Sequence, residues 1–101
     1  MRMIMLVQFP IEPFNTAVRN GTVQAKMKAI LDALKPETAY FSSHDGQRGG
    51  IFVVDVQDPS DVVRLAEPLF LTFNAAIEFQ VAITPEELGR ANLDALGKKW
   101  A

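Results

Sequence analysis

The sequence predicts an α+β domain of the ferredoxin-like type, a βαββαβ sandwich in which a four-stranded antiparallel sheet has two helices on one face. Three observations support this prediction. Short apolar or β-branched segments and segments of helical periodicity follow one another in this order. Asp45-Gly46 lies between the second and third strand segments, where a hairpin needs a tight turn. The other two connections are long enough for crossover helices, and right-handed crossovers place both on the same face.

The first part of the chain supplies one strand and one helix. Residues 3–9 are apolar except for Gln8, which is typical of a strand, and Pro10 ends it because proline cannot donate to a ladder. Over residues 22–35 apolar side chains recur at helical spacing, with Thr22 as the expected N-cap and Pro36 as the stop. The apolar face of this helix consists of Val23, Met27, Ile30, Leu31 and Leu34.

A hairpin and a second helix follow. Residues 38–44 and 51–56 are predicted as paired strands, joined by a turn-rich tip over residues 44–50. Asp58 is placed to cap the next helix and Pro59 suits its first position. Pro68 falls inside the apolar pattern of that helix, so we expect a kink or a restart there.

The last part of the chain is predicted as a fourth strand and a terminal helix. Residues 77–83 alternate between apolar and polar side chains. Thr84, Pro85 and Glu87 then have the spacing of a helix start with a capping box. We expect Trp100 to pin this terminal helix either to the body of the domain or to a partner subunit.

The composition excludes several classes of function. The chain has 101 residues, so residues 1–101 are expected to form a single domain. A net charge of −2 without a basic cluster argues against nucleic-acid binding. There is no cysteine, and the single histidine among scattered carboxylates is poor material for a metal site, so we expect no metal and no cofactor. No segment approaches the ~20 apolar residues of a membrane span, which favours a cytoplasmic protein without a membrane partner.

Alternation along the strands divides the predicted sheet into two faces of different character. The face expected to meet the helices is almost entirely apolar and consists of Met3, Met5, Val7, Phe9, Ala39, Phe41, Phe52, Val54, Val56, Ile77, Phe79, Val81 and Ile83. The other face is mixed and consists of Ile4, Leu6, Gln8, Tyr40, Ser42, His44, Ile51, Val53, Asp55, Glu78, Gln80 and Ala82. This mixture is too apolar for solvent and predicts partial cover by a second sheet, with a wet pocket between the two. We therefore expect a two-fold symmetric homodimer.

Five stretches also resemble a known group of proteins. They are Leu34-Lys35-Pro36-Glu37, Ala39-Tyr40-Phe41, Ala66-Glu67-Pro68 with Phe70, Phe73-Asn74-Ala75 leading to Ile77-Glu78-Phe79, and Thr84-Pro85-Glu86-Glu87-Leu88. With them the chain is similar, over nearly its whole length, to a family of small bacterial proteins with the dimeric α/β-barrel form of the ferredoxin-like fold. The resemblance implies a fold and a homodimer but no activity. Other dimeric α/β barrels include cofactor-free monooxygenases and muconolactone-isomerase-like enzymes, which use the cavity against the sheet, an analogy at the level of fold alone.

Three residues are candidates for catalysis. His44 is the only imidazole and can act as a general base near neutral pH, although its place beside a hairpin tip favours a solvated surface histidine. Asp55, in an apolar strand, can have a raised pKa and move protons, or it can form an ion pair at an interface. Glu78 projects to the same mixed face, where it can act on a proton or pair with Arg2.

The candidates for ligand binding are Gln8, Tyr40, Ser42 and Gln80 on the mixed face. The Tyr40 hydroxyl can hydrogen-bond a ligand, or the ring can simply pack. Arg48 lies among glycines that can cradle an anion, although turn formation explains those glycines equally well.

Two classes of function stay open at this stage. The first is a homodimer that binds a small apolar or amphipathic ligand against the sheet or has only a structural role. The second is a small cofactor-free enzyme, of isomerase or monooxygenase type, in which a carboxylate or His44 transfers a proton. They differ in geometry, because an enzyme needs several of these groups to converge on one pocket.

Overall fold

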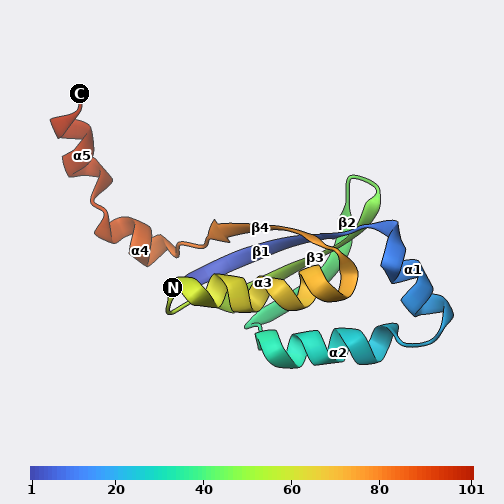
Figure 1. The fold of residues 1–101 in the computed structure, drawn as a ribbon. Helices are drawn as coiled ribbons and strands as arrows, with labels where there is room; N and C mark the ends of the chain where they lie inside the picture. Colours follow the sequence, from blue (N-terminus) through green and yellow to red (C-terminus); the bar gives the residue numbers. More distant parts are fainter.

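The computed structural model describes the whole chain, residues 1–101 (Figure 1). The secondary-structure elements, in chain order, are β1 (Arg2–Phe9), α1 (Ile11–Arg19), α2 (Val23–Leu34), β2 (Thr38–His44), β3 (Gln47–Asp55), α3 (Pro59–Phe73), β4 (Ala76–Val81), α4 (Pro85–Arg90) and α5 (Leu93–Lys99). None of these helices combines the length and the apolar character needed to cross a membrane.

The four strands form one antiparallel sheet in the order β2-β3-β1-β4. Strand β1 lies in the centre, where Met5 pairs with Phe52 of β3 on one side and with Phe79 of β4 on the other. The crossovers through α2 and α3 place both helices on one side of the sheet (Figure 1). This arrangement confirms the predicted ferredoxin-like βαββαβ fold.

The β2–β3 hairpin is tighter than the sequence analysis predicted. Its loop is only Asp45-Gly46, with φ angles of 50° and 75°, as a two-residue type I′ turn requires. Strand β3 therefore begins at Gln47 rather than at Ile51, and Gly49 and Gly50 are paired strand residues.

The core lies between the sheet and the helices. It includes the helix-facing side chains of β1 and β3, together with Ile30 and Leu34 of α2 and Leu69 and Phe73 of α3. At one end, the ring of Phe14 from α1 lies 4.9 Å from that of Phe73, and both contact Phe9, so α1 closes this end of the core.

The helices cover only the central part of the apolar sheet face, although the sequence predicted that they would cover all of it. The side chains of Ala39 and Phe41 on edge strand β2, of Val81 at the end of β4, and of Ile83, which was predicted within that strand but lies beyond it, are exposed. The ring of Phe41 still contacts that of Phe52 edge-on, with centroids 5.7 Å apart. Two helices therefore bury the central strands and leave both edges of the sheet open.

Helix α3 begins as predicted, with Asp58 as its N-cap, and Asp61 completes a capping box. The Asp58 side chain accepts a hydrogen bond from the Ser60 backbone N–H at 2.9 Å, and Asp61 accepts from the Asp58 N–H at 3.0 Å. Hydrogen bonds from the Ser60 hydroxyl and backbone lower the pKa of Asp58, and the bond from Arg64 is the main cause that lowers the pKa of Asp61. The helix continues through Pro68 without a break, so the restart expected there does not occur.

Helix α2 starts in a different way from the prediction. The Thr22 side chain makes no capping hydrogen bond to the helix. Instead, Asn20 Oδ1 accepts from the backbone N–H of Thr22 at 3.2 Å and from its hydroxyl at 2.6 Å. The turn before the helix is therefore held by the Asn20 side chain.

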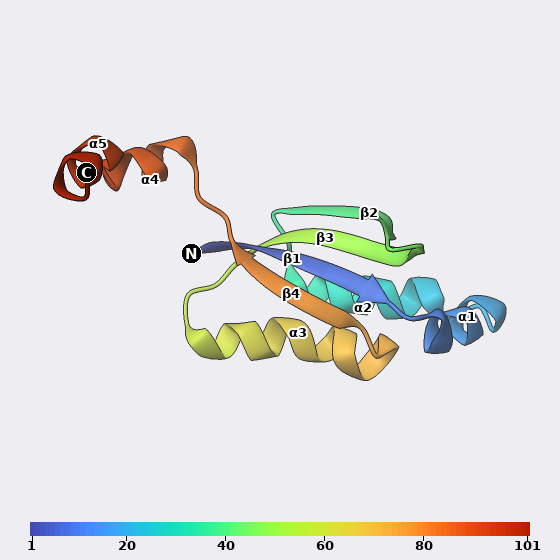
Figure 2. The ribbon, with the colours of Figure 1, turned by 90° about the horizontal axis from the view of Figure 1, so that it is seen from above.

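The C-terminal segment forms two helices rather than one. Thr84 and Glu87 make the predicted capping box of α4, and Asn92, with φ 55°, separates α4 from α5. The segment extends past the end of the sheet at which β1 begins (Figure 2), and no residue of either helix is buried. Trp100 therefore does not pin this segment to the body of its own subunit.

Candidate functional site

The sheet face away from the helices has no cover within the chain, and its side chains lie in cross-strand rows. Glu78, Leu6, Ile51 and Tyr40 form one row across β4, β1, β3 and β2. Beside it lies the row of Ala76, Gln8, Gly49 and Ser42, and on the other side the row of Gln80, Ile4, Val53 and Thr38. The register thus confirms the predicted mixed face, which we call the open sheet face.

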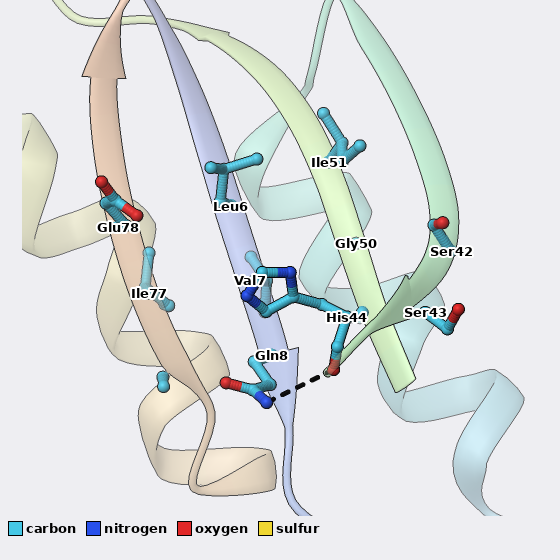
Figure 3. Close-up of a pocket in the computed structure, with 12 residues that line it drawn as sticks. Leu6, Val7, Gln8, Ser42, Ser43, His44, Gly50, Ile51, Ile77 and Glu78 are labelled. Atoms are coloured by element: carbon cyan, nitrogen blue, oxygen red, sulfur yellow. Dashed lines mark hydrogen bonds between the residues drawn. The ribbon is translucent and has the colours of Figure 1, made fainter. Parts of the chain in front are cut away.

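The open sheet face is hollowed at the end nearest the β2–β3 turn (Figure 3). The hollow has a volume of about 280 Å³. Its lining residues are Leu6, Val7, Gln8, Ser42, Ser43, His44, Gly49, Gly50, Ile51, Ala76, Ile77 and Glu78. Apolar walls with a few polar groups are typical of a small-molecule site.

Gly49 leaves room for this hollow, whereas Gly50 faces the core, where a Cβ would lie 2.8 Å from Cζ of Phe52. A Cβ atom at Gly49 would lie 3.6 Å from the Cβ of His44 and 3.0 Å from the backbone oxygen of Val7. A side chain at this position would therefore occupy the space beside His44. Gly49 and Gly50 were predicted in the turn, although glycine within a strand also marks a close approach of another group.

His44 lies at the end of β2 beside the hollow. Figure 3 shows its imidazole directed over the sheet toward Val7 and Leu6. Its Nε2 lies 3.4 Å from Asp45 Oδ2, and its backbone oxygen accepts a hydrogen bond from Gln8 Nε2 at 3.4 Å. The histidine and the Gln8 amide therefore border the same hollow, from neighbouring parts of the sheet.

Glu78 borders the hollow from β4, and its oxygen Oε1 accepts a hydrogen bond from Gln80 Nε2 at 3.3 Å. The expected ion pair between Glu78 and Arg2 does not form. Arg2 instead donates from Nε to Glu37 at 3.1 Å and lies 3.7 Å from Glu87, and the Glu37 hydrogen bond is the main cause that raises the pKa of Arg2. The Glu78 carboxylate therefore has no cationic partner.

Three candidates lie outside the hollow. Tyr40 and Gln80 lie on the open sheet face but do not line it. Asp55 is at the opposite end of β3 from the turn, where it accepts hydrogen bonds from Gln57 Nε2 at 3.0 Å and from the Met1 amino group at 3.2 Å. The Gln57 bond, followed by the amino group, lowers the pKa of Asp55. The expectation of a raised pKa is wrong because this carboxylate is exposed and has two donors.

The anion-cradle hypothesis for Arg48 does not fit its position. Its Nη1 donates to Asn15 Oδ1 at 2.7 Å, and its guanidinium lies 4.5 Å from the centre of the Phe14 ring. The side chain thus ties β3 to α1. Histidine and carboxylate side chains nowhere form a group of three or more that could hold a metal ion.

The structure therefore brings together four of the candidates. Gln8, Ser42, His44 and Glu78 border one hollow with apolar walls, and they offer an amide, a hydroxyl, an imidazole and a carboxylate. Such a set can hold the polar end of a molecule whose apolar part lies on Leu6. Proton transfer would require His44 and Glu78 to reach the same bound molecule.

Comparison with known proteins adds no functional assignment. No model of a protein family matches the chain, and no curated protein matches its sequence.

Proposed function

We propose that the chain forms a homodimer through its open sheet face and binds a small amphipathic molecule in the hollow beside His44. The observation that supports the proposal most is the composition of the hollow. Its apolar lining comes from β1, β3 and β4, and its polar groups, from Gln8, Ser42, His44 and Glu78, gather around one end of the sheet. This is the usual composition of a site that orients a mostly apolar ligand by a few hydrogen bonds.

The dimer is proposed because the open sheet face has an apolar centre. Ile4, Leu6 and Val53 are only partly buried within one subunit, and Ile51 is 38% exposed. Two sheets pack face to face about 10 Å apart, so a second copy would cover these side chains and enclose the hollow. The resemblance to the small bacterial dimeric α/β-barrel proteins supports the same contact. The absence of cysteine is consistent with a cytoplasmic location.

Binding is favoured over catalysis because few reactive groups meet at the hollow. His44 is the only imidazole in the chain, and Asp55 lies at the other end of the sheet. An enzyme site needs a positioned acid, base or nucleophile with a supporting group within hydrogen-bond reach. A binding site needs only shape and a few polar contacts.

The binding proposal can be tested by NMR titration of the ¹⁵N-labelled full chain with four probes: benzoate, phenol, indole and hexanoate. We expect at least one probe to shift the amide resonances of Gln8, Gly49 and Ile51 in a saturable manner. In Gly49→Ala the added methyl group occupies part of the hollow, so the variant should bind that probe more weakly. Gly97→Ala is the matched control, because a Cβ there has no neighbour within 4 Å.

Ser42→Leu adds a second test at the exposed edge strand, where a larger side chain can be accommodated without disturbing the core. The larger side chain should also obstruct the hollow, so this variant should bind the same probe more weakly. Saturable shifts that persist unchanged in both Gly49→Ala and Ser42→Leu, or shifts confined to another surface, would contradict the proposed site.

The dimer is tested separately by light scattering of the full chain, whose subunit mass is 11.2 kDa. We expect a dimer, and we expect Ile51→Glu to shift the population toward monomer because it places a charge at the centre of the open sheet face. Leu71→Glu, at a highly exposed position on α3, is the control and should not change the mass. A monomeric wild type over the whole accessible concentration range would refute the dimer.

A second candidate function is a cofactor-free isomerase-like activity. It is favoured by one observation, that the His44 imidazole and the Glu78 carboxylate line the same hollow (Figure 3). Incubation in ²H₂O with enolisable ketones and lactones tests it, because a positioned base would catalyse deuterium incorporation next to the carbonyl. The activity should be lost in His44→Gln; incorporation at the rate of the buffer alone would exclude proton abstraction from these compounds.

A further inference from the structure

The C-terminal arm, residues 84–101, has no packing partner within its own subunit. Its large apolar side chains, Leu88, Leu93, Leu96 and Trp100, are 49%, 59%, 43% and 76% exposed. The contacts that tie it to the body are polar and lie at its base: Arg2 Nη1 is 3.7 Å from Glu87, and the Ala82 N–H donates to the Arg2 oxygen at 3.1 Å. The arm therefore extends from the body without a hydrophobic contact to hold it in place.

Two short helices of this kind are not stable by themselves. Helix α4 has 6 residues and α5 has 7, whereas isolated helices shorter than ~12–15 residues are marginal in water. Their caps are nevertheless well formed: Thr84 and Glu87 make a capping box, and Asn92 Oδ1 accepts from the Ala95 N–H at 3.3 Å. The sequence thus specifies two helices whose apolar side chains contact nothing in their own subunit. This indicates that another molecule supplies the surface on which they pack.

The apolar side chains of α5 lie on one side of the helix. Leu93, Leu96 and Trp100 follow an i, i+3, i+7 spacing, which places them on one face, and Ala95 falls on the opposite side. Tryptophan is among the residues most enriched at the anchors of protein–protein interfaces, and Trp100, at the C-cap of α5, lies on the same face as the two leucines. The arm is therefore suited to dock by this face.

The direction of the arm identifies the occupant. In Figure 1, α2 and α3 lie below the sheet, α4 lies past the end of the sheet at about its level, and α5 rises on the side of the open sheet face. At 1.5 Å per residue, α4 and α5 are each about 10 Å long. A second sheet packed about 10 Å away, with its helices beyond it, would lie within their reach. A partner on the open sheet face would thus have the arm of the first subunit beside it.

We infer that the C-terminal arm of each subunit docks, through Leu93, Leu96 and Trp100, against the second copy of the chain that covers its open sheet face. This inference rests on the proposed sheet-to-sheet homodimer and adds a reciprocal exchange of arms to it. Because a two-fold axis relates the subunits, both arms make the same contact. The arm contact is a separate part of the interface, so the two proposals can fail independently.

The test measures the dimer dissociation constant of the full chain by sedimentation across a dilution series. Trp100→Glu and Leu96→Glu should each weaken the dimer by about 30-fold or more, the loss typical of an interface anchor. Ala95→Glu is the matched control, since it adds the same charge to the opposite side of the same helix. None of these residues belongs to the core, so all three variants should still fold, and any loss of helical circular dichroism in Trp100→Glu and Leu96→Glu should not exceed the contribution of α4 and α5.

A second readout comes from Trp100, the single tryptophan of the chain. In the docked arm its indole leaves water, so the emission maximum should move to longer wavelength on dilution, in step with the loss of dimer. The arm exchange would be overturned if Trp100→Glu, Leu96→Glu and Ala95→Glu all dimerised as tightly as the wild type and the wild-type dimer had the emission of an indole in water. The sheet-to-sheet dimer would then remain supported. A chain that remains monomeric at every concentration would overturn both.

Discussion

Replacing Gly50 with alanine adds a single methyl group, and the structure predicts how this change affects stability. Gly50 is buried in β3, and a Cβ there would lie 2.8 Å from Cζ of Phe52. Carbon atoms in contact are normally about 3.5 Å or more apart, so the ring would have to move by about 0.7 Å. Phe52 is fully buried, so a shift of its ring must displace neighbouring core side chains.

The expected magnitude is the difference between two effects. Overpacking of a core costs about 1–3 kcal/mol, whereas replacing glycine inside a strand removes a conformational cost of about 0.5–1 kcal/mol. The difference spans about 0–2.5 kcal/mol, and we expect a net loss of about 1 kcal/mol in the free energy of unfolding. This corresponds to a melting temperature lower by roughly 4 °C or more in a domain of this size.

The assay is chemical denaturation at fixed protein concentration, because association contributes to the stability of a dimer. Combining Gly50→Ala with Phe52→Leu tests whether contact with the Phe52 ring causes the loss, because the smaller side chain makes room for the new methyl group. The double variant should be more stable than the sum of the single losses by about 1 kcal/mol. A Gly50→Ala chain as stable as the wild type, or losses that simply add, would show that the Phe52 ring is not what makes glycine necessary here.

Three further predictions concern the helix ends and the link between α1 and the sheet. Thr84→Ala removes the capping box of α4 and should speed amide hydrogen exchange in that helix while leaving the melting temperature of the body unchanged. Arg48→Met removes the cation over the Phe14 ring and should destabilise the fold by about 0.5–1 kcal/mol in denaturation experiments. The pKa values of Asp58 and Asp61 are lowered in the folded chain, so their contribution is present above the ordinary aspartate pKa and is lost as the pH falls through the lower folded values. Asp61→Asn should therefore flatten the decline of stability at acid pH, and an unchanged slope would contradict this assignment.

The order and type of the elements could be predicted because they depend on local patterns. The apolar run of β1, the alternation of β4, the helical spacing in α2 and the Asp58 cap of α3 are all visible in a few neighbouring residues. The glycines of β3 were misassigned because the same residue type serves turns and close packing. Only the position of Phe52 over Gly50 distinguishes the two uses.

For the candidate site, the sequence could predict which side of the sheet each residue faces, but not which of these residues lie close together. Alternation placed His44 and Asp55 on the same side of the sheet, which is correct. Whether they meet depends on the register, and the hairpin puts one beside its turn and the other at the far end of β3. The pairing of Arg2 was missed for a similar reason, because Glu37 and Glu87 approach it from segments outside the sheet.

The central position of β1 has a consequence for how the chain reaches its fold. This strand is synthesised first, yet both of its neighbours come later, β3 from residue 47 and β4 from residue 76 onward. During synthesis the hairpin of β2 and β3 can form from nearby residues, whereas β1 must wait for partners that are distant in sequence. Its apolar segment, with methionines at 3 and 5, is therefore the part of the nascent chain most exposed to aggregation and to chaperone binding.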